Sequence, residues 1–412
     1  MFMDRKTTRL KYACYTTGLT MSIVANLPPL LFLTFRSLYG ISFTQLGLLV
    51  LVNYVTQLGI DLIFSFFSHR LSIQKSVKAT PFIAVAGLLF YAASPFLFPN
   101  ATYIGLLIGT IVFSAAGGFA EVLISPVIAA IPAPNPDREM SKLHSVYAWG
   151  VVVVVIVSTL FLLAFNKTSW PLLTIIMALI PLCSAILFIG TTLPPMETPE
   201  RASGAFKLLQ NRGIWFCFIA IFLGGAAECT MSQWASGYLE QALQIPKVWG
   251  DIFGVALFAI TLGIGRTLYG KYGRNLGKVL FLGAIAASTC YLIAAVTQAA
   301  VIGLLACAFT GLCTAMFWPG NLVVASERFP SGGIFIYALM AAGGDLGASI
   351  GPQIIGVVTD SVIRNPDAVV IAQNIGLTSE QFGMKIGMLI GMLFPFAAIF
   401  FYYSIMKSQR KS

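Results

Sequence analysis

Long apolar stretches alternate with short polar segments along the whole chain. An apolar stretch of about 20 residues is the length that an α-helix needs to cross the hydrocarbon core of a bilayer. The strands of a transmembrane β-barrel are about half as long and alternate apolar with polar positions, which these stretches do not. We therefore predict an all-α integral membrane protein with twelve transmembrane helices. The predicted ranges are 12–35, 44–67, 79–98, 102–131, 144–165, 170–191, 213–239, 249–270, 277–296, 300–326, 333–359 and 381–406.

The longest polar connection in the middle of the chain lies at residues 192–212, with six predicted helices on each side. A weak internal repeat accompanies this division. Ser65–Arg70 follows the second helix, and Gly270–Arg274 follows the eighth, about 205 residues later. We predict two pseudo-symmetric six-helix bundles at residues 1–191 and 213–412, joined by a linker at 192–212.

The composition supports a membrane protein and excludes a soluble enzyme. Hydrophobic residues make up 58% of the 412 residues and charged residues only 10%, whereas soluble domains carry about 25% charged residues. The net charge of +10 would also suit a nucleic-acid-binding protein. The basic residues, however, occur singly in short segments and form no continuous stripe, so we expect no nucleic-acid partner.

The positive charges instead indicate how the chain is oriented in the membrane. If twelve helices alternate in direction, 20 of the 25 Lys and Arg residues share a side with the N-terminus, and 5 lie on the other side. Cytoplasmic segments of membrane proteins carry the excess of Lys and Arg. We predict that both termini and the linker are cytoplasmic, in a cell membrane of the bacterial inner-membrane type.

Few residues are available for metal or cofactor chemistry. The seven cysteines lie inside apolar stretches without paired spacing, and the chain has two histidines. Metal sites and hydrolytic active sites need clusters of such residues, and no nucleotide-binding motif occurs in the sequence. We therefore expect no metal, no cofactor and no enzymatic activity.

The segments after the second and eighth helices resemble a signature of the major facilitator superfamily. The signature reads Gly-x-x-x-Asp-Arg; in the first half Arg70 is retained, and Ser65 and His69 replace the Gly and the Asp. The second copy is better preserved and includes Arg266 and Arg274. The resemblance covers nearly the whole chain. It implies a transporter with two six-helix bundles and a cytoplasmic gate that contains Arg70, Arg266 and Arg274.

A more specific resemblance lies in the predicted fourth and fifth helices. The runs Gly-Gly-Phe-Ala-Glu121 and His-x-x-Tyr147-x-x-Gly150 are similar to those of the fucose-permease-like branch, which includes proton-coupled sugar symporters. In that branch the glutamate at the position of Glu121 couples transport to proton movement. The branch has a second acid in its first helix, whereas the matching stretch here reads Ala-Asn26-Leu-Pro.

Three acids fall near the middle of predicted helices, namely Glu121, Glu228 and Asp345. A charged carboxylate at that depth costs about 2.5–3.5 kcal/mol on insertion scales, so it persists where it is protonated, paired or in contact with water. We interpret these three acids as candidate proton-coupling residues. The alternative is a neutral acid that hydrogen-bonds to a neighbouring helix. For Asp61, nearer the cytoplasmic end of the second helix, we predict a gate-side ion pair or a helix contact.

Binding a polyhydroxylated solute needs neutral hydrogen-bonding side chains and an aromatic face, because hydroxyl groups that leave water must find new partners. Side chains of these kinds occur in the middles or inner halves of several predicted helices. The candidates are Asn26, Asn53, Gln57, Tyr147, Trp149, Gln233, Trp234, Trp318 and Asn321. For Trp149, Trp234 and Trp318, which lie deeper than the other tryptophans, we favour cavity lining over core packing.

Together these features predict a secondary active transporter that moves a small polar solute, a sugar or related polyol, by proton-coupled alternating access. The alternative is proton-driven efflux of an amphipathic compound by the same fold. The 32 phenylalanines and the missing acid in the first helix favour that alternative. We expect a monomer whose partners are the small-molecule solute, protons and the lipid bilayer.

Overall fold

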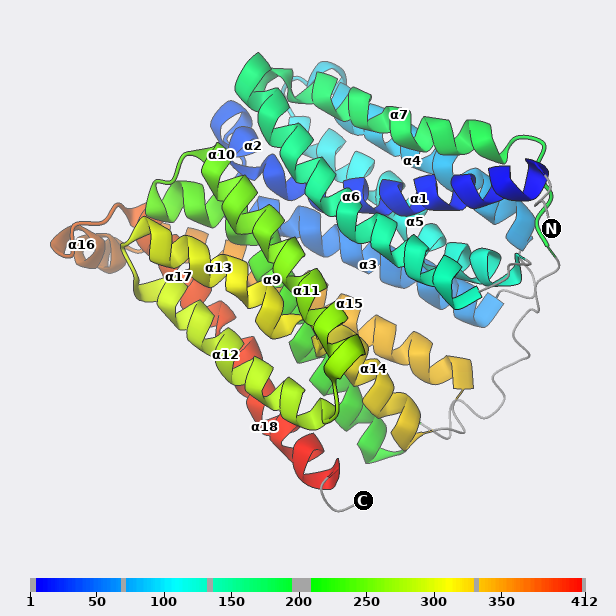
Figure 1. The fold of residues 1–412 in the computed structure, drawn as a ribbon. Helices are drawn as coiled ribbons and strands as arrows, with labels where there is room; N and C mark the ends of the chain where they lie inside the picture. The colour runs from blue at the N-terminus through cyan, green and yellow to red at the C-terminus, as the bar shows by residue number, and fades with distance from the viewer. Residues whose placement is uncertain (1–4, 68–71, 132–135, 195–208, 330–332, 410–412) are drawn as a thin grey trace. The chain divides into compact units, whose positions relative to one another are not determined.

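The computed structural model describes residues 5–67, 72–131, 136–194, 209–329 and 333–409, which form helices and connecting segments and no β-strand. The helices of the first half are α1 (Arg5–Leu30), α2 (Phe32–Tyr39), α3 (Phe43–Phe67), α4 (Ile73–Leu97), α5 (Thr102–Ala130), α6 (Pro136–Phe165), the 3₁₀ turn η2 (Lys167–Ser169) and α7 (Trp170–Phe188) (Figure 1). Those of the second half are α9 (Arg212–Leu243), α10 (Lys247–Trp249), the π-helix η3 (Gly250–Ala256), α11 (Leu257–Tyr272), α12 (Leu276–Val296), α13 (Ala300–Thr314), α14 (Phe317–Arg328), α15 (Gly333–Arg364), α16 (Pro366–Asn374), α17 (Ser379–Gly391) and α18 (Leu393–Gln409).

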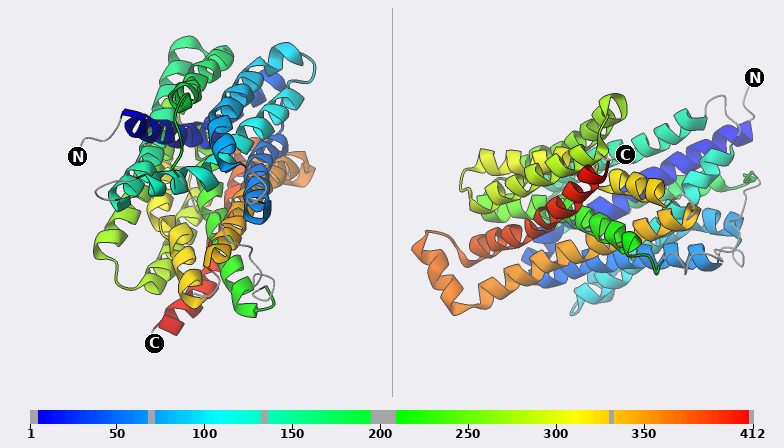
Figure 2. Two further views of the ribbon diagram at one scale, coloured as in Figure 1. Left: turned by 90° about the vertical axis from the view of Figure 1, so that its right-hand side faces the viewer. Right: turned by 90° about the horizontal axis from the view of Figure 1, so that it is seen from below.

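The number of membrane-spanning segments agrees with the prediction. Within the described residues, 11 helical segments are long and apolar enough to cross a bilayer, and the bent pair α1 and α2 raises the number to 12. Four of these segments are composite: η2 with α7, α10 with η3 and α11, α13 with α14, and α17 with α18. The short helix α16 lies between α15 and α17 and was not predicted (Figure 2). The all-α membrane fold is therefore confirmed.

Prolines account for two of the interruptions. A proline has no backbone N–H, so the carbonyl four residues earlier loses its helical hydrogen bond. Pro28 and Pro29 precede the 46° bend between α1 and α2. Pro319 follows the break between α13 and α14, and it deprives the carbonyl of Ala315 of its helical donor. This second break lies at the candidate site described below.

Contacts divide the chain into two units, each described here by itself. The first unit comprises Met1–Thr34 and Val55–Ala202, and the second comprises Phe35–Tyr54 and Ser203–Ser412. Helix α3 therefore begins in the second unit and ends in the first. The predicted bundle boundaries differ from this division at residues 35–54. Of the predicted linker, residues 195–208 lie outside the described residues.

Each unit has its own apolar core. In the first unit, Leu10, Val127, Leu143 and Phe188 belong to one buried cluster, drawn from α1, α5, α6 and α7. In the second unit, a buried cluster joins α9, α12, α14 and α18 around Phe317. The helices that carry the candidate site residues are thus held by close packing within their own unit.

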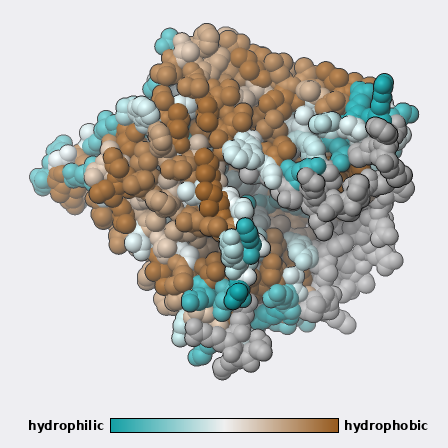
Figure 3. Space-filling view, in the orientation of Figure 1, coloured by the Kyte–Doolittle hydropathy of each residue, from teal (hydrophilic) through white to brown (hydrophobic). Residues whose placement is uncertain are grey.

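The outward-facing surfaces are also apolar. In Figure 3 hydrophobic residues cover α7 and the upper part of α6 in the first unit and α12 and α13 in the second, whereas hydrophilic residues gather near helix ends, for example at α16. Large apolar side chains are well exposed on these helices, with Leu163 at 64% and Val296 at 66%. Such continuous exposure is unfavourable in water and is expected for a surface that contacts lipid.

Candidate functional site

Two acidic side chains lie together in the first unit. Asp61 is on α3 and Glu121 is on α5, and a carboxylate oxygen of one lies within 4.8 Å of a carboxylate oxygen of the other. Asp61 is buried, and Glu121 is partly exposed. The sequence predicts a gate-side ion pair or a helix contact for Asp61. The structure places it beside the candidate proton-coupling residue.

The approach of α3 to α5 depends on a pair of glycines. A Cβ atom on Gly117 would lie 3.2 Å from Oε1 of Gln57, and one on Gly118 would lie 2.9 Å from a side-chain atom of α3. Residues four apart lie on the same face of a helix. Gln57 and Asp61 therefore form one polar face on α3, and Gly117 and Glu121 form the opposing face on α5. This geometry explains why the motif before Glu121 contains two glycines.

Other candidate residues of the first unit lie where α1 meets α6. The hydroxyl of Ser22 donates to the backbone oxygen of Tyr147 at 2.8 Å, and the amide of Asn26 donates to the backbone oxygen of Ser22 at 2.9 Å. Asn26 and Tyr147 are both partly exposed. These contacts orient polar groups on two neighbouring helices.

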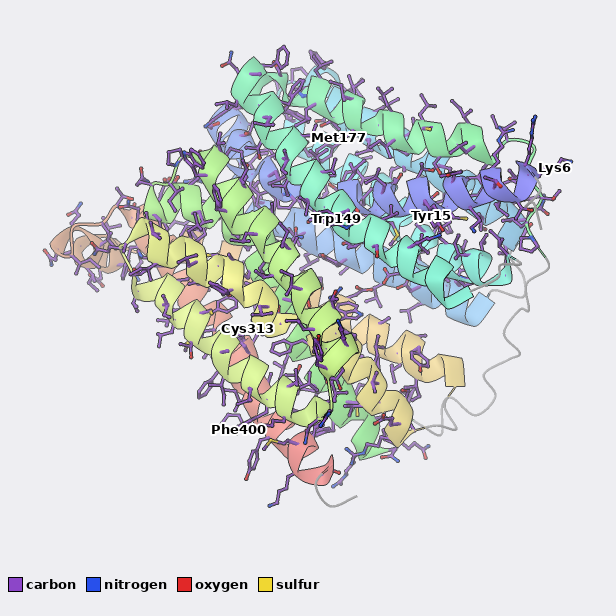
Figure 4. All side chains as sticks on the ribbon, viewed as in Figure 1. Lys6, Tyr15, Trp149, Met177, Cys313 and Phe400 are labelled. Atoms are coloured by element: carbon purple, nitrogen blue, oxygen red, sulfur yellow. The ribbon has the colours of Figure 1, made fainter. Side chains whose placement is uncertain are left out.

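An open apolar groove of about 470 Å³ runs beside the same helix pair. Trp149 lies in its wall and is 67% exposed. Figure 4 shows Trp149 on α6 and Tyr15 on the neighbouring α1. The lining residues are Tyr15, Leu19, Lys142, Ser145, Val146, Trp149, Gly150 and Val153. The groove therefore offers mainly aliphatic and aromatic contact.

The second unit holds an ion pair inside its predicted membrane-spanning segments. Nη2 of Arg266 on α11 lies 3.2 Å from Oε1 of Glu228, which is at the centre of α9. Nε of the same arginine donates to the backbone oxygen of Ala315 at 3.1 Å. This oxygen is the one that lacks a helical donor because of Pro319. Arg266 thus connects the mid-helix acid to the break between α13 and α14.

Two further candidate residues of the second unit, Asp345 and Trp318, lie at a close contact between α9 and α15. A Cβ atom on Gly225 of α9 would lie 2.4 Å from the backbone oxygen of Gly344 on α15. Asp345 follows directly and is 3% exposed. The ring of Trp318 packs on Gly344, since a Cβ atom there would lie 2.6 Å from a ring carbon. Glu228 is one turn beyond Gly225, so the two acids of this unit project from adjacent helices.

Several predicted substrate-binding residues are buried. Asn321 is 1% exposed and donates to the hydroxyl of Tyr402 at 2.8 Å. Trp234 is fully buried, and its Nε1 donates to the backbone oxygen of Pro352 at 2.8 Å. The ring of Trp234 packs against Phe43, and its predicted place in a substrate cavity stays a prediction. Asn53, Gln57 and Gln233 are also buried, at 3%, 7% and 3% exposed.

Comparison with known proteins identifies the family. A profile of the Major Facilitator Superfamily matches residues 13–352. The chain belongs to the major facilitator superfamily. An uncharacterised MFS-type transporter of Yersinia pestis is 26% identical over 333 residues, which cover 77% of this chain and 82% of that protein.

Solved transporter structures share the fold. A mutant of the nucleoside transporter NupG superposes with a TM-score of 0.73 at 14% identity, covering 96% of this chain and 100% of that one. A D-xylose–proton symporter superposes with a TM-score of 0.69 at 17% identity, covering 94% of this chain and 96% of that one. The outward conformation of FucP superposes with a TM-score of 0.60 at 17% identity, covering 98% of this chain and 99% of that one. At these identities the similarity is one of fold.

The three arginines predicted to form a cytoplasmic gate in this transporter lie in different settings. Arg274 is exposed in the segment between α11 and α12, and Arg70 lies outside the described residues. Arg266 lies within α11, and its guanidinium contacts Glu228. The structure thus associates Arg266 with the interior acid of the second unit, while a gate role for Arg70 and Arg274 stays a prediction.

Some polar contacts of the second unit, among them those of Asp360, were not predicted from the sequence. The carboxylate of Asp360 on α15 accepts hydrogen bonds from the backbone N–H groups of Phe43 at 3.2 Å and Thr44 at 2.7 Å, the first two residues of α3. Nearby in the chain, Arg36 forms an ion pair with Glu380. An acid directly after the predicted range 333–359 is visible in the sequence at residue 360. Two of its partners are backbone N–H groups of a distant segment, which no side-chain pattern reveals.

Proposed function

We propose that this protein is a proton-coupled secondary active transporter of a small polar solute, a sugar or related polyol, and that Glu121 couples proton movement to solute movement by alternating access. We further propose that it acts as a monomer in the cell membrane with both termini in the cytoplasm. The observation that carries the proposal is the close pair of carboxyl groups formed by Glu121 and Asp61.

The distance between these carboxyl groups favours a proton site on electrostatic grounds. Two unit negative charges about 5 Å apart repel by roughly 3 kcal/mol at an effective dielectric constant of about 20. A pair at this distance therefore favours a state in which one of the two groups is protonated over a state in which both groups are ionised. Loss of that proton adds a charge inside a membrane-spanning region, which is costly unless the site gains access to water. Proton release is thus tied to a change in the surroundings of Glu121.

The partly exposed polar and aromatic side chains support the proposed solute class. Asn26 and Tyr147 in the first unit and Trp318 in the second offer amide, hydroxyl and aromatic surfaces on predicted spans. Hydroxylated solutes need such partners to replace water. In accord with this proposal, the solved structures with the same fold include a D-xylose–proton symporter and a nucleoside transporter.

The groove beside α1 and α6 favours a second candidate function, the efflux of an amphipathic compound. Its wall is formed largely by Tyr15, Leu19, Val146, Trp149 and Val153, and a surface of this kind binds apolar rings better than hydroxyl groups. A thermal-shift screen of purified protein against sugars, polyols and amphipathic cations separates the two candidates. Stabilisation by cations alone would favour efflux.

The experiment that tests proton coupling compares two transport modes in proteoliposomes. Glu121→Gln keeps the size and hydrogen bonding of the side chain but cannot bind and release a proton. We expect uphill uptake driven by a pH gradient to be lost in this variant, and exchange between equal solute pools to survive. Asp367→Asn, which removes an exposed acid from α16, is the matched control and retains both modes. Uphill uptake by Glu121→Gln would remove Glu121 from the coupling role.

A further inference from the structure

The ion pair between Arg266 and Glu228 is unusual because it brings a guanidinium into a predicted membrane-spanning region. Glu228 lies at the centre of the 32-residue helix α9. The side chain of Arg266 is 41% exposed, and that of Glu228 is 15% exposed. A charged group at such a depth faces water or a ligand, since contact with lipid tails is strongly unfavourable. Intramembrane arginines therefore mark functional sites.

A hydrogen bond and a close backbone approach position Arg266 beside Ala315. Nε donates to the backbone oxygen of Ala315, and a Cβ atom on the preceding residue, Gly265, would lie only 2.6 Å from the Cβ atom of Ala315. The backbone of α11 therefore lies directly against the break between α13 and α14. An arginine has five N–H donors. Within the described residues, Arg266 uses one on Ala315 and one on Glu228.

Within the described part of the chain, the acid of the pair uses only one of its two carboxylate oxygens. Oε1 of Glu228 accepts the bond from Arg266, whereas Oε2 is buried and has no hydrogen-bond partner among the described residues. An ionised carboxylate needs several donors, and an unpaired buried carboxylate oxygen is unfavourable. Binding a proton at Glu228 removes this negative charge.

Protonation of Glu228 changes the charge of the site in a way that selects for the solute. With Glu228 ionised, the pair is neutral; with Glu228 protonated, Arg266 carries an uncompensated positive charge inside the membrane. A neutral solute leaves that charge in place, but a carboxylate on the solute restores neutrality. A guanidinium also binds a carboxylate through two parallel hydrogen bonds. Proton uptake and binding of an anion thus favour each other.

We propose that the solute carries a carboxylate, as a sugar acid does, that this carboxylate replaces Glu228 as the partner of Arg266, and that Glu228 takes up a proton when it does so. The proton ends on Glu228, and the solute stays ionised. This inference rests on the proposed function and narrows its solute class to carboxylated, polyhydroxylated compounds.

The test measures binding of matched pairs of compounds to the purified full-length protein. Each pair differs by a carboxylate in place of a CH₂OH group: D-galacturonate with D-galactose, D-glucuronate with D-glucose, and D-gluconate with D-glucitol. We expect the acid of at least one pair to bind about tenfold or more tightly than its neutral partner. Its affinity is expected to fall by up to tenfold for each unit of pH increase above the range in which Glu228 holds its proton. Equal or tighter binding of the neutral members would overturn the inference.

Variants identify the residues involved. Arg266→Gln should abolish the preference for the acid, and Glu228→Gln, which frees Arg266, should retain it without the pH dependence. Arg266→Gln alone leaves Glu228 without its partner. The double variant Arg266→Gln with Glu228→Gln avoids this, because both side chains are then neutral, and it should also lose the preference for the acid. Arg364→Gln removes an exposed arginine at the end of α15 and serves as the control.

The outcomes also separate this inference from the proposed function. Uphill, proton-coupled transport of a neutral sugar would support the proposed function and refute the inference that the solute carries a carboxylate. If binding of the carboxylated compound depends on Arg266 and Glu121→Gln still shows uphill uptake, the inference of a carboxylated solute is supported and coupling through Glu121 is refuted. A preference for the acid that survives in the double variant would refute the role of Arg266.

Discussion

Replacement of Asp360 by asparagine tests whether one carboxylate holds the start of α3 against α15. The carboxylate of Asp360 accepts hydrogen bonds from the backbone N–H groups of Phe43 and Thr44. These are two of the N–H groups that the first turn of any helix leaves without an internal partner. A Cβ atom on Gly356 would lie 2.3 Å from the backbone oxygen of Phe43, so the two backbones are in direct contact there.

The magnitude follows from the two bonds and the charge. A hydrogen bond to a charged group contributes about 1.5–3 kcal/mol, and a negative charge at a helix N-terminus contributes about 0.3–1 kcal/mol. The asparagine side chain would keep one acceptor oxygen but present an NH₂ group to the second N–H, and it would lack the charge. We expect Asp360→Asn to cost roughly 2 kcal/mol, which corresponds to about a thirtyfold increase in local opening.

Hydrogen–deuterium exchange followed by mass spectrometry measures this opening directly. Amide exchange at the start of α3 requires the backbone N–H groups to leave their acceptors. In Asp360→Asn, peptides that cover residues 41–48 should exchange about thirtyfold faster than in the wild type, while peptides from α12 are unchanged. Asp367→Asn is the control and should leave residues 41–48 as they are. Unchanged exchange in Asp360→Asn would refute the reasoning.

Two further predictions concern packing and topology. Gly265→Ala places a methyl group 2.6 Å from the Cβ atom of Ala315 and should lower the free energy of unfolding by about 1–3 kcal/mol. The control is Gly263→Ala, whose Cβ atom meets nothing within 4 Å and which should leave the free energy of unfolding unchanged. Equal melting temperatures of the two variants would contradict the packing account. With both termini cytoplasmic, a membrane-impermeant thiol reagent applied to intact cells should modify Lys167→Cys but not Ala205→Cys, and the reverse pattern would invert the topology.

The membrane-spanning helices were predictable because their signal is local. A run of about 20 apolar residues is sufficient to indicate a span, and the predicted range 277–296 matches α12 at Leu276–Val296 to within one residue. The bend after Pro29 was not predicted, although the prolines were visible in the sequence. The short helix α16 was missed because it is not apolar enough to resemble a span.

The candidate site was predictable only in part, because most of its contacts join distant segments. Glu121 was identified from its motif, but its neighbour Asp61 comes from another helix and depends on how α3 packs on α5. Arg266 was assigned to a gate from its position in a signature. Its actual partners, Glu228 and the backbone oxygen of Ala315, depend on a helix break that Pro319 produces. Burial of Trp234 likewise depends on its tertiary neighbours.

The central claim, that solute and protons move together through a site containing Glu121, is tested most directly by measuring proton movement driven by the solute alone. Proteoliposomes with a pH-sensitive dye inside, and no imposed pH gradient, receive an inward gradient of the solute that the binding screen identifies. The account predicts that the interior of wild-type vesicles acidifies as solute enters, and that vesicles containing Glu121→Gln show no pH change. Solute entry into wild-type vesicles without acidification, or equal acidification with Glu121→Gln, would contradict it.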